Sequence, residues 1–465
     1  MRVFFVVPNS KGDVLLKPSS PHNGTAYLAS TLLHNGHTVK VLDMRLDYTD
    51  EDLFKRLSDF KPDLVAITMT SREFLNIYKL VNKVKRHGYK VIVGGPHPST
   101  IGAKILEDTL ADYACLGEGE FTLLELANGK KSSKIKGLIW RDKNKIVTNK
   151  PRPLIENLDE IPFPAFELFE LDKYMDKKIS MVTSRGCPYA CTYCTMRFTM
   201  GMKFRARSPK NVVDEIEYWY KKGYCYFAFV DDCFTYDMKR AENICDEILR
   251  RKLRIKWDLK NGIRVDKVNE VLLRKMKNAG CFFIAFGVES ADQGILNKMK
   301  KGITVKMAED AVRLAKKVGI KDVSGFFIIG MPGDNLMNFR KTLDFALSLP
   351  FDEIRFYNAV PYPNTELFSW IRKNANLLGS PDNYLNNASR WDSKPIFETP
   401  DFSRQERQNA FELAQEYVMK YLMRVEFGSF VGYLAWLVWK PRLTRPFVMS
   451  VGKKGWTLLR HLRKG

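Results

Sequence analysis

The most constraining feature of this sequence is the repeated alternation of short, β-branched apolar runs with longer helical stretches. Such alternation is typical of α/β folds with parallel sheets, in which consecutive units are joined by right-handed crossovers. The first 130 residues hold five units, with strand candidates at 3–7, 38–42, 64–68, 90–93 and 113–116. We therefore predict a doubly wound, Rossmann-like domain over residues 1–130.

A second β/α series begins near residue 179 and predicts a (βα)6-type partial TIM barrel over residues 179–375. Its strand candidates are 179–183, 226–230, 256–261, 282–287, 325–330 and 353–357. Four prolines interrupt residues 131–178, which we interpret as a linker: Pro151, Pro153, Pro162 and Pro164. Residues 376–465 are expected to form a helical, basic C-terminal region, with one long helix from Ser403 to Arg424.

Three cysteines at spacings of four and three, Cys187, Cys191 and Cys194, directly follow the first strand candidate of the second series. Three thiolates on one tight loop can bind three irons of a four-iron cluster and leave the fourth iron open. The alternative is a zinc site, but structural zinc takes four ligands, and no histidine lies between His97 and His461. The spacing therefore favours an iron–sulfur cluster.

This Cys-x3-Cys-x2-Cys pattern, with Tyr193 before the last cysteine, resembles the signature of the radical S-adenosylmethionine (SAM) superfamily. The resemblance implies a [4Fe-4S] cluster held by Cys187, Cys191 and Cys194, whose open iron binds SAM and whose reduction yields a 5′-deoxyadenosyl radical. In that family, residues at the following strand ends bind SAM. The matching positions here are Asp232, Arg264, Glu289 and Ser290, and Tyr193 is carried over with them.

Together with such a barrel, the first 130 residues resemble the cobalamin (B12)-binding domain of one large class of radical SAM enzymes. Cobalamin would then lie at the carboxyl ends of the first strands, where glycines allow close approach. The residues implied are Thr68, Thr70, Gly94, Gly95, Pro96, His97, Gly117, Glu118, Gly119 and Glu120. The loop after the first strand, residues 8–13, has no histidine that could serve as an axial cobalt ligand. A purely structural Rossmann-like domain is the alternative.

Composition and the N-terminal sequence indicate the cellular compartment and the kind of surface the protein attracts. The N-terminus lacks a signal-peptide pattern and the eight cysteines need no disulfides, so we expect a cytoplasmic protein. A net charge of +22 attracts polyanions, which include nucleic acid and anionic membrane.

Residues 420–465 concentrate that charge, with ten lysines or arginines and one acidic residue, Glu426. They also contain an uncharged run, 427–439, that is too short to span a bilayer. This run predicts either a helix buried against the barrel or an anchor, including Trp436 and Trp439, on an anionic membrane face.

The resemblance implies cobalamin-dependent methylation of an unactivated carbon, or a cyclisation or rearrangement, on a small or lipid-like substrate. The expected partner of the protein is an electron donor such as flavodoxin or ferredoxin. No nucleic-acid partner is expected. Two alternatives stay open. One is an RNA methylthiotransferase, although that family carries three cluster cysteines in its N-terminal domain and this chain has only Cys115 there. The other is a non-catalytic cobalamin sensor.

Overall fold

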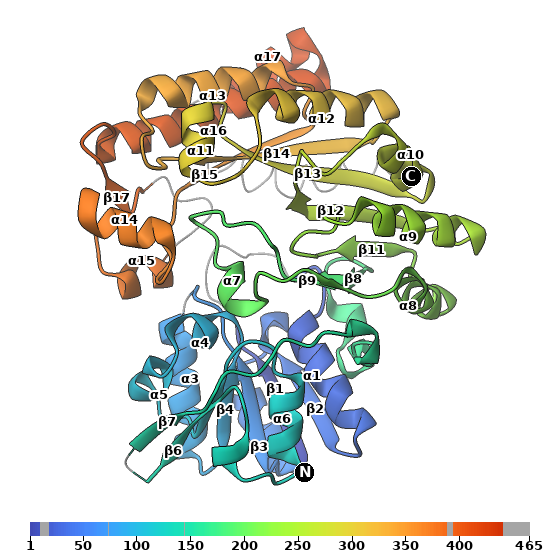
Figure 1. Cartoon of the computed structure of the whole chain (residues 1–465), viewed down its shortest axis with the longest axis vertical. Coiled ribbons are helices and arrows are strands. Elements are labelled where there is room, and N and C mark those ends of the chain that lie inside the picture. The colour runs from blue at the N-terminus through green and yellow to red at the C-terminus, as the bar shows by residue number, and fades with distance from the viewer. Residues whose placement is uncertain (10–17, 73, 144, 388–393, 440–465) are drawn as a thin grey trace.

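A computed structural model describes residues 1–9, 18–72, 74–143, 145–387 and 394–439 of the chain. Within these ranges two open sheets lie one above the other, the N-terminal one at the bottom of Figure 1 and the second above it. The loop after the first strand, residues 8–13, which contains no histidine, lies partly within residues 10–17 and so partly outside the described residues.

The first sheet has seven strands in the order β2-β1-β3-β4-β5-β6-β7. Strands β1 to β5 are parallel, as predicted, and their faces are covered by helices (Figure 1). The strands are β1 (Arg2–Val7), β2 (Thr38–Asp43), β3 (Leu64–Thr68), β4 (Val91–Gly94), β5 (Tyr113–Cys115), β6 (Leu138–Asp142) and β7 (Lys145–Thr148). The helices are α1 (Asn23–His34), α2 (Asp50–Phe60), α3 (Phe74–Arg86), α4 (Pro96–Ile101), α5 (Lys104–Asp108) and α6 (Glu120–Ala127).

The interpretation of residues 131–178 as a linker without regular structure is wrong in its first part. Strands β6 and β7 form an antiparallel hairpin that continues the first sheet beyond β5. Leu138 and Ile139 of β6 are fully buried, which explains why this segment belongs to the sheet. The remainder runs through short 3-10 turns between the two sheets: Leu158–Glu160, Phe166–Leu168 and Leu171–Lys173.

The second sheet is an open, six-stranded parallel sheet in the order β15-β14-β13-β12-β11-β8, which confirms the predicted partial barrel. Its strands are β8 (Ile179–Met181), β11 (Tyr226–Phe229), β12 (Lys256–Ile263), β13 (Cys281–Glu289), β14 (Asp322–Ile329) and β15 (Glu353–Asn358). The helices that pack on it are α8 (Pro209–Lys221), α9 (Met238–Arg250), α10 (Glu270–Asn278), α11 (Gln293–Lys298), α12 (Val305–Val318) and α13 (Leu336–Ser348). Two-residue strands β9 (Ser184–Arg185) and β10 (Arg205–Ala206) flank the short helix α7 (Met196–Thr199).

The C-terminal region packs on both units. Helix α16 (Arg404–Phe427) is capped by Ser403, which forms a capping box with Glu406. Buried Arg407 donates from Nη1 to the carbonyl of Gly330, 2.9 Å away, and so fastens α16 to the end of β14. The other elements here are α14 (Glu366–Asn374), β16 (Asn376–Leu377), α15 (Pro381–Asn387), β17 (Phe397–Glu398) and α17 (Ser429–Trp439).

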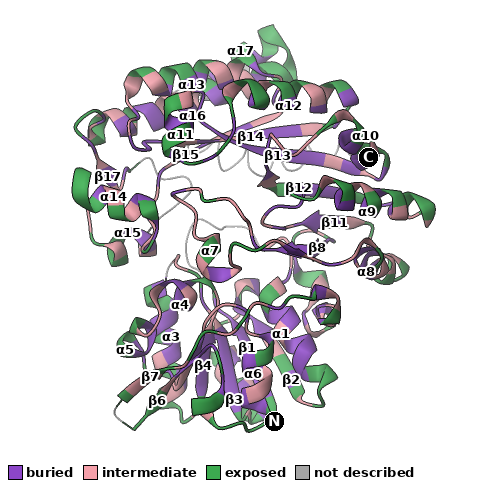
Figure 2. Ribbon diagram, in the orientation of Figure 1, coloured by how far each residue is buried: buried purple, intermediate pink, exposed green. Residues whose placement is uncertain are grey.

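Burial follows the sheets. In Figure 2 the strands of both sheets are largely buried, whereas the outer faces of the helices are exposed. The main core lies between the second sheet and its helices and includes Trp219 and Trp257, both essentially inaccessible. Among the described residues, no helix is both long and apolar enough to cross a membrane.

Candidate active site between the two sheets

The loop that carries the three cysteines, residues 186–195, is called here the cluster loop; it connects β9 to α7. Its entry requires glycine, because Gly186 has φ 83° and a Cβ there would collide with the carbonyl oxygen of Lys203. Backbone hydrogen bonds hold the middle of the loop. The amide of Thr192 donates to the carbonyl of Met299 at 3.1 Å, and the carbonyl of Thr192 accepts from the amide of Leu367 at 2.9 Å. The loop is therefore fixed by the barrel on both sides.

The three thiols are half-buried and none forms a disulfide. Burial raises the pKa of Cys191 and raises that of Cys194 to about 11. A hydrogen bond from the thiol of Cys233 lowers the pKa of Cys187 to about 7. Sequence reasoning missed Cys233, because no motif spacing connects it to Cys187.

Among the described residues, no three His, Cys, Asp or Glu side chains converge as ligands of one metal ion would. A cubane makes a different demand, because each of its cysteines binds a separate iron. Three thiols spread over one loop suit that donor set better than a tetrahedral zinc site, which needs four ligands around one point.

Three of the predicted SAM-binding side chains reach the cluster loop from successive strand ends. Asp232, after β11, accepts from the amide of Gly186 at 2.9 Å, and burial raises its pKa to about 6. The guanidinium of Arg264, after β12, lies 3.5 Å from the ring centroid of Tyr189.

Glu289, the last residue of β13, accepts from the hydroxyl of Tyr193 at 3.1 Å and pairs with buried Lys301 at 2.7 Å. Ser290 is buried too, but it faces Thr342, with its hydroxyl 3.4 Å from that of the threonine. Sequence reasoning missed Lys301, which lies in no motif and meets Glu289 only in the fold.

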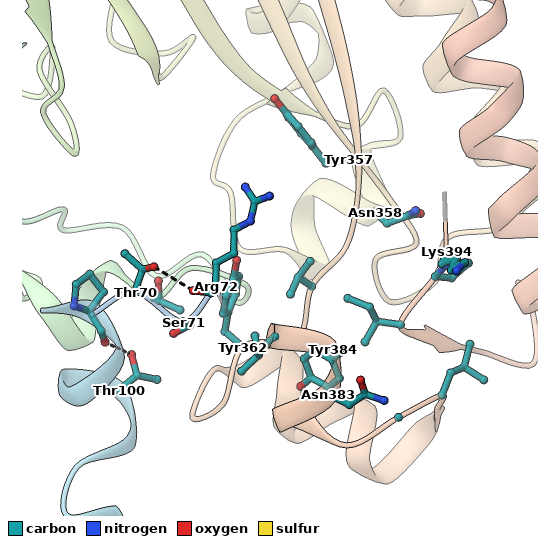
Figure 3. Close-up of a pocket in the computed structure, with 18 of the residues that line it drawn as sticks. Thr70, Ser71, Arg72, Thr100, Tyr357, Asn358, Tyr362, Asn383, Tyr384 and Lys394 are labelled. Carbon is teal, nitrogen blue, oxygen red and sulfur yellow. Dashed lines mark hydrogen bonds between the residues drawn. The ribbon is translucent and has the colours of Figure 1, made fainter. Parts of the chain in front are cut away.

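A cavity of about 780 Å³ lies between the carboxyl ends of the two sheets. From the first sheet it is lined by Thr70, Ser71, Arg72, Pro96 and Thr100, as Figure 3 shows in part. From the second unit and the C-terminal region its lining includes Thr195, Lys260, Asn261, Phe326, Arg355, Tyr357, Asn358, Tyr362, Tyr384 and Lys394. Because Thr195 directly follows Cys194, the cavity reaches the cluster loop.

The residues predicted to bind cobalamin lie in three settings, of which the first is the cavity wall. Thr70 and Pro96 line this cavity, and Thr68, Gly94 and Gly95 lie beside them at the ends of β3 and β4. Gly95 has φ 106°, and a Cβ there would stand 2.8 Å from the carbonyl oxygen of Met69, so its glycine is required by the backbone itself.

His97 does not line the cavity. Its ring is stacked on Phe74, and its two nitrogens lie 2.9 Å from the hydroxyl of Tyr78 and 3.2 Å from that of Ser71. Burial lowers its pKa to about 4, so the ring is neutral at physiological pH. The structure gives His97 contacts that hold Ser71, a residue of the cavity wall.

Glu118 and Glu120 belong to a buried ion-pair network that joins the two units. Arg185 donates to Glu118 at 2.9 Å and to Glu120 at 2.7 Å, and Arg205 binds both carboxylate oxygens of Glu118 at 2.8 Å. All four side chains are at most 6% exposed. Gly117 and Gly119 form the turn that carries Glu118, and β9, which carries Arg185, leads directly into the cluster loop.

The chemistry of these sites fits the implied cofactors. The cluster loop presents the soft thiols that iron requires. The side of the cavity formed by the first sheet presents the hydroxyls of Thr70, Ser71 and Thr100, which suit a large uncharged ring edged with amides.

Comparison with known proteins identifies the same two domains, one in each sheet-containing unit. The family model of the radical SAM superfamily matches residues 181–346, and that of the B12 binding domain matches residues 16–127. The second match favours cobalamin over the RNA methylthiotransferase alternative.

Several relatives are named as methyltransferases, and two of them are at least 30% identical to this chain. The chain is 35% identical over 393 residues to an uncharacterized methyltransferase of Pyrococcus horikoshii, covering 81% of this chain and 84% of the relative. It is 30% identical over 415 residues to cytidylyl-2-hydroxyethylphosphonate methyltransferase of Streptomyces wedmorensis, covering 74% of this chain and 76% of that protein.

The fold is also that of a solved structure, the radical SAM methyltransferase TsrM from Kitasatospora setae, with cobalamin and a [4Fe-4S] cluster bound. The TM-score is 0.68 at 22% identity, with 79% of this chain and 73% of TsrM covered.

Proposed function

This chain belongs to the radical SAM enzymes that carry a B12-binding domain, and from that premise we propose that it transfers a methyl group to an unactivated carbon. Its cofactors are a [4Fe-4S] cluster, SAM and cobalamin. When bound, they supply a 5′-deoxyadenosyl radical that removes hydrogen from the substrate and a corrin-borne methyl group that replaces it.

One observation carries the proposal: the cluster loop and the strand ends of the B12-binding domain open onto the same cavity. A substrate in that cavity can contact both cofactor sites without leaving the protein. Pre-arranged reactants of this kind gain rate from proximity.

The chain's own residues would do the positioning. Cys187, Cys191 and Cys194 hold three irons, and Asp232, Arg264 and Glu289 keep the cluster loop in place beside the bound SAM. Lys301 neutralises Glu289, which would otherwise be an unpaired carboxylate buried beside the cluster loop.

The substrate is proposed to be small or lipid-like. Phe326, Tyr357, Tyr362 and Tyr384 supply apolar and aromatic surface to the cavity wall, which suits a substrate with an apolar body. A flavodoxin or ferredoxin would deliver the electron, and the enzyme would work in the cytoplasm, with a lipid-like substrate bringing it to the inner membrane face.

The test is an anaerobic assay with SAM carrying a deuterated methyl group, reductant, cobalamin and a lipid-containing cell extract. The proposal expects 5′-deoxyadenosine together with a product that gains the deuterated methyl. A product without label, formed alongside 5′-deoxyadenosine, would mean cyclisation or rearrangement instead.

A further inference from the structure

One side of helix α17 exposes an apolar face. Phe430 is 75% exposed, and four further large apolar side chains on the helix are between 41% and 55% exposed: Val431, Tyr433, Leu434 and Leu437. At 3.6 residues per turn these five positions fall on one side of the helix. Such a continuous patch marks an interaction surface, whereas singly exposed apolar residues are ordinary.

The opposite side of α17 is fixed against the end of α16. Trp436 is buried there in a cluster with Met419 and Met423. A Cβ on Gly432 would collide with the carbonyl of Met423, so the two helices are in backbone contact. This packing sets which side of α17 faces outward.

Positive charge lies at the edge of this face. The ammonium of Lys420 is 5.9 Å from the ring centroid of exposed Tyr433 and 4.7 Å from that of Trp436. The sequence directly after α17, residues 440–465, adds eight lysines or arginines and no acidic residue. An apolar face beside such charge complements a surface that is anionic outside and apolar inside.

We propose that this face docks on an anionic lipid bilayer, with Phe430, Leu434 and Leu437 inserted at the boundary between headgroups and acyl chains. Each nearby lysine or arginine adds on the order of 1 kcal/mol at such a surface. A second copy of the chain is a poor occupant, because it would bring an equally positive segment against this one. Helix α17 lies at the end of the molecule opposite the first sheet (Figure 1), so docking would leave that sheet turned away from the bilayer.

The test is flotation of the full-length protein with phosphatidylcholine vesicles, with and without phosphatidylglycerol. The wild-type chain should float with the anionic vesicles and stay unbound with the neutral ones. The double variant Phe430→Glu/Leu434→Glu should partition at least about 100-fold more weakly, because two large apolar side chains no longer enter the bilayer. The matched control is Met337→Glu on α13, whose side chain is 74% exposed and which should float like wild type.

Three results would overturn the proposal. Wild-type protein that stays unbound with anionic vesicles would show that the chain does not dock on such a bilayer. A double variant that floats as well as wild type would leave α17 without a part in binding. A wild-type dimer that the double variant converts to a monomer, without any flotation, would assign the face to a second copy. Unchanged circular dichroism of the double variant excludes unfolding as the cause of lost flotation.

Discussion

Individual residues carry the chemistry in the cluster loop, and Cys191 tests it most simply. We expect Cys191→Ala to lower bound iron well below about four per chain and to reduce 5′-deoxyadenosine formation by more than about 100-fold, because one iron loses its protein ligand. Iron analysis and product chromatography measure both effects. Cys225→Ala is the control, since Cys225 is an exposed free cysteine; equal losses in both variants would contradict the assignment.

His97 makes a prediction about pH. Its pKa is lowered by burial to about 4, below the unfolded value of 6.5, so the folded state holds the neutral ring. Its contribution to stability is complete above pH 6.5 and is lost as pH falls through 6.5 toward 4, by about 3 kcal/mol in all. When the free energy of unfolding is measured with urea between pH 7.5 and pH 4, the His97→Gln variant should lose about 3 kcal/mol less than wild type over this range. A variant that loses stability as steeply as wild type would show that His97 does not titrate this way.

At this scale, the sequence reveals candidate site residues where they share a loop or follow a strand. Three cysteines on one loop, and acidic or basic residues at strand ends, are visible in the sequence, and the fold brings Asp232, Arg264 and Glu289 to the cluster loop. Lys301 and Cys233 could not be found, because neither lies in a recognisable motif and each meets its partner, Glu289 or Cys187, only in the fold. The direct contact of His97 with cobalamin stays a prediction.

At the scale of elements, the ion-pair network of Glu118, Glu120, Arg185 and Arg205 connects the turn after β5 to the strand that precedes the cluster loop. A substitution that removes one partner of a buried ion pair leaves an uncompensated charge. Glu118→Gln should therefore lower the free energy of unfolding by about 3–5 kcal/mol.

The control for this prediction is an exposed ion pair nearby. Glu156 pairs with Lys203, and both side chains are more than 60% exposed. Glu156→Gln should change stability by less than about 1 kcal/mol. Urea unfolding followed by tryptophan fluorescence compares the two variants. Similar small changes in both would mean that the network does not hold the units together.

Strands β6 and β7, which the sequence did not reveal, are short. They have five and four residues, and only Leu138 and Ile139 of β6 are buried, so neither strand shows a continuous apolar run. The parallel strands were predictable because both of their faces are covered, which makes them continuous apolar runs.

For the whole molecule, the arrangement of the two sheets matters most. Their carboxyl ends face a common cavity, and α15 closes it from the C-terminal side by packing Tyr384 and Leu385 into the core of the first unit. The order of the two domains was predictable from the sequence. Their relative placement depends on contacts such as that of Glu118 with Arg205, which charge patterns alone cannot pair.

The most direct test of the central claim is the optical spectrum and metal content of the protein, reconstituted anaerobically with iron, sulfide and cobalamin and then freed of unbound cofactor. We expect iron–sulfur absorption together with corrin bands, with about four irons and about one cobalt per chain. Zinc in place of iron, or a spectrum without iron–sulfur absorption, would contradict the assignment of a radical SAM enzyme.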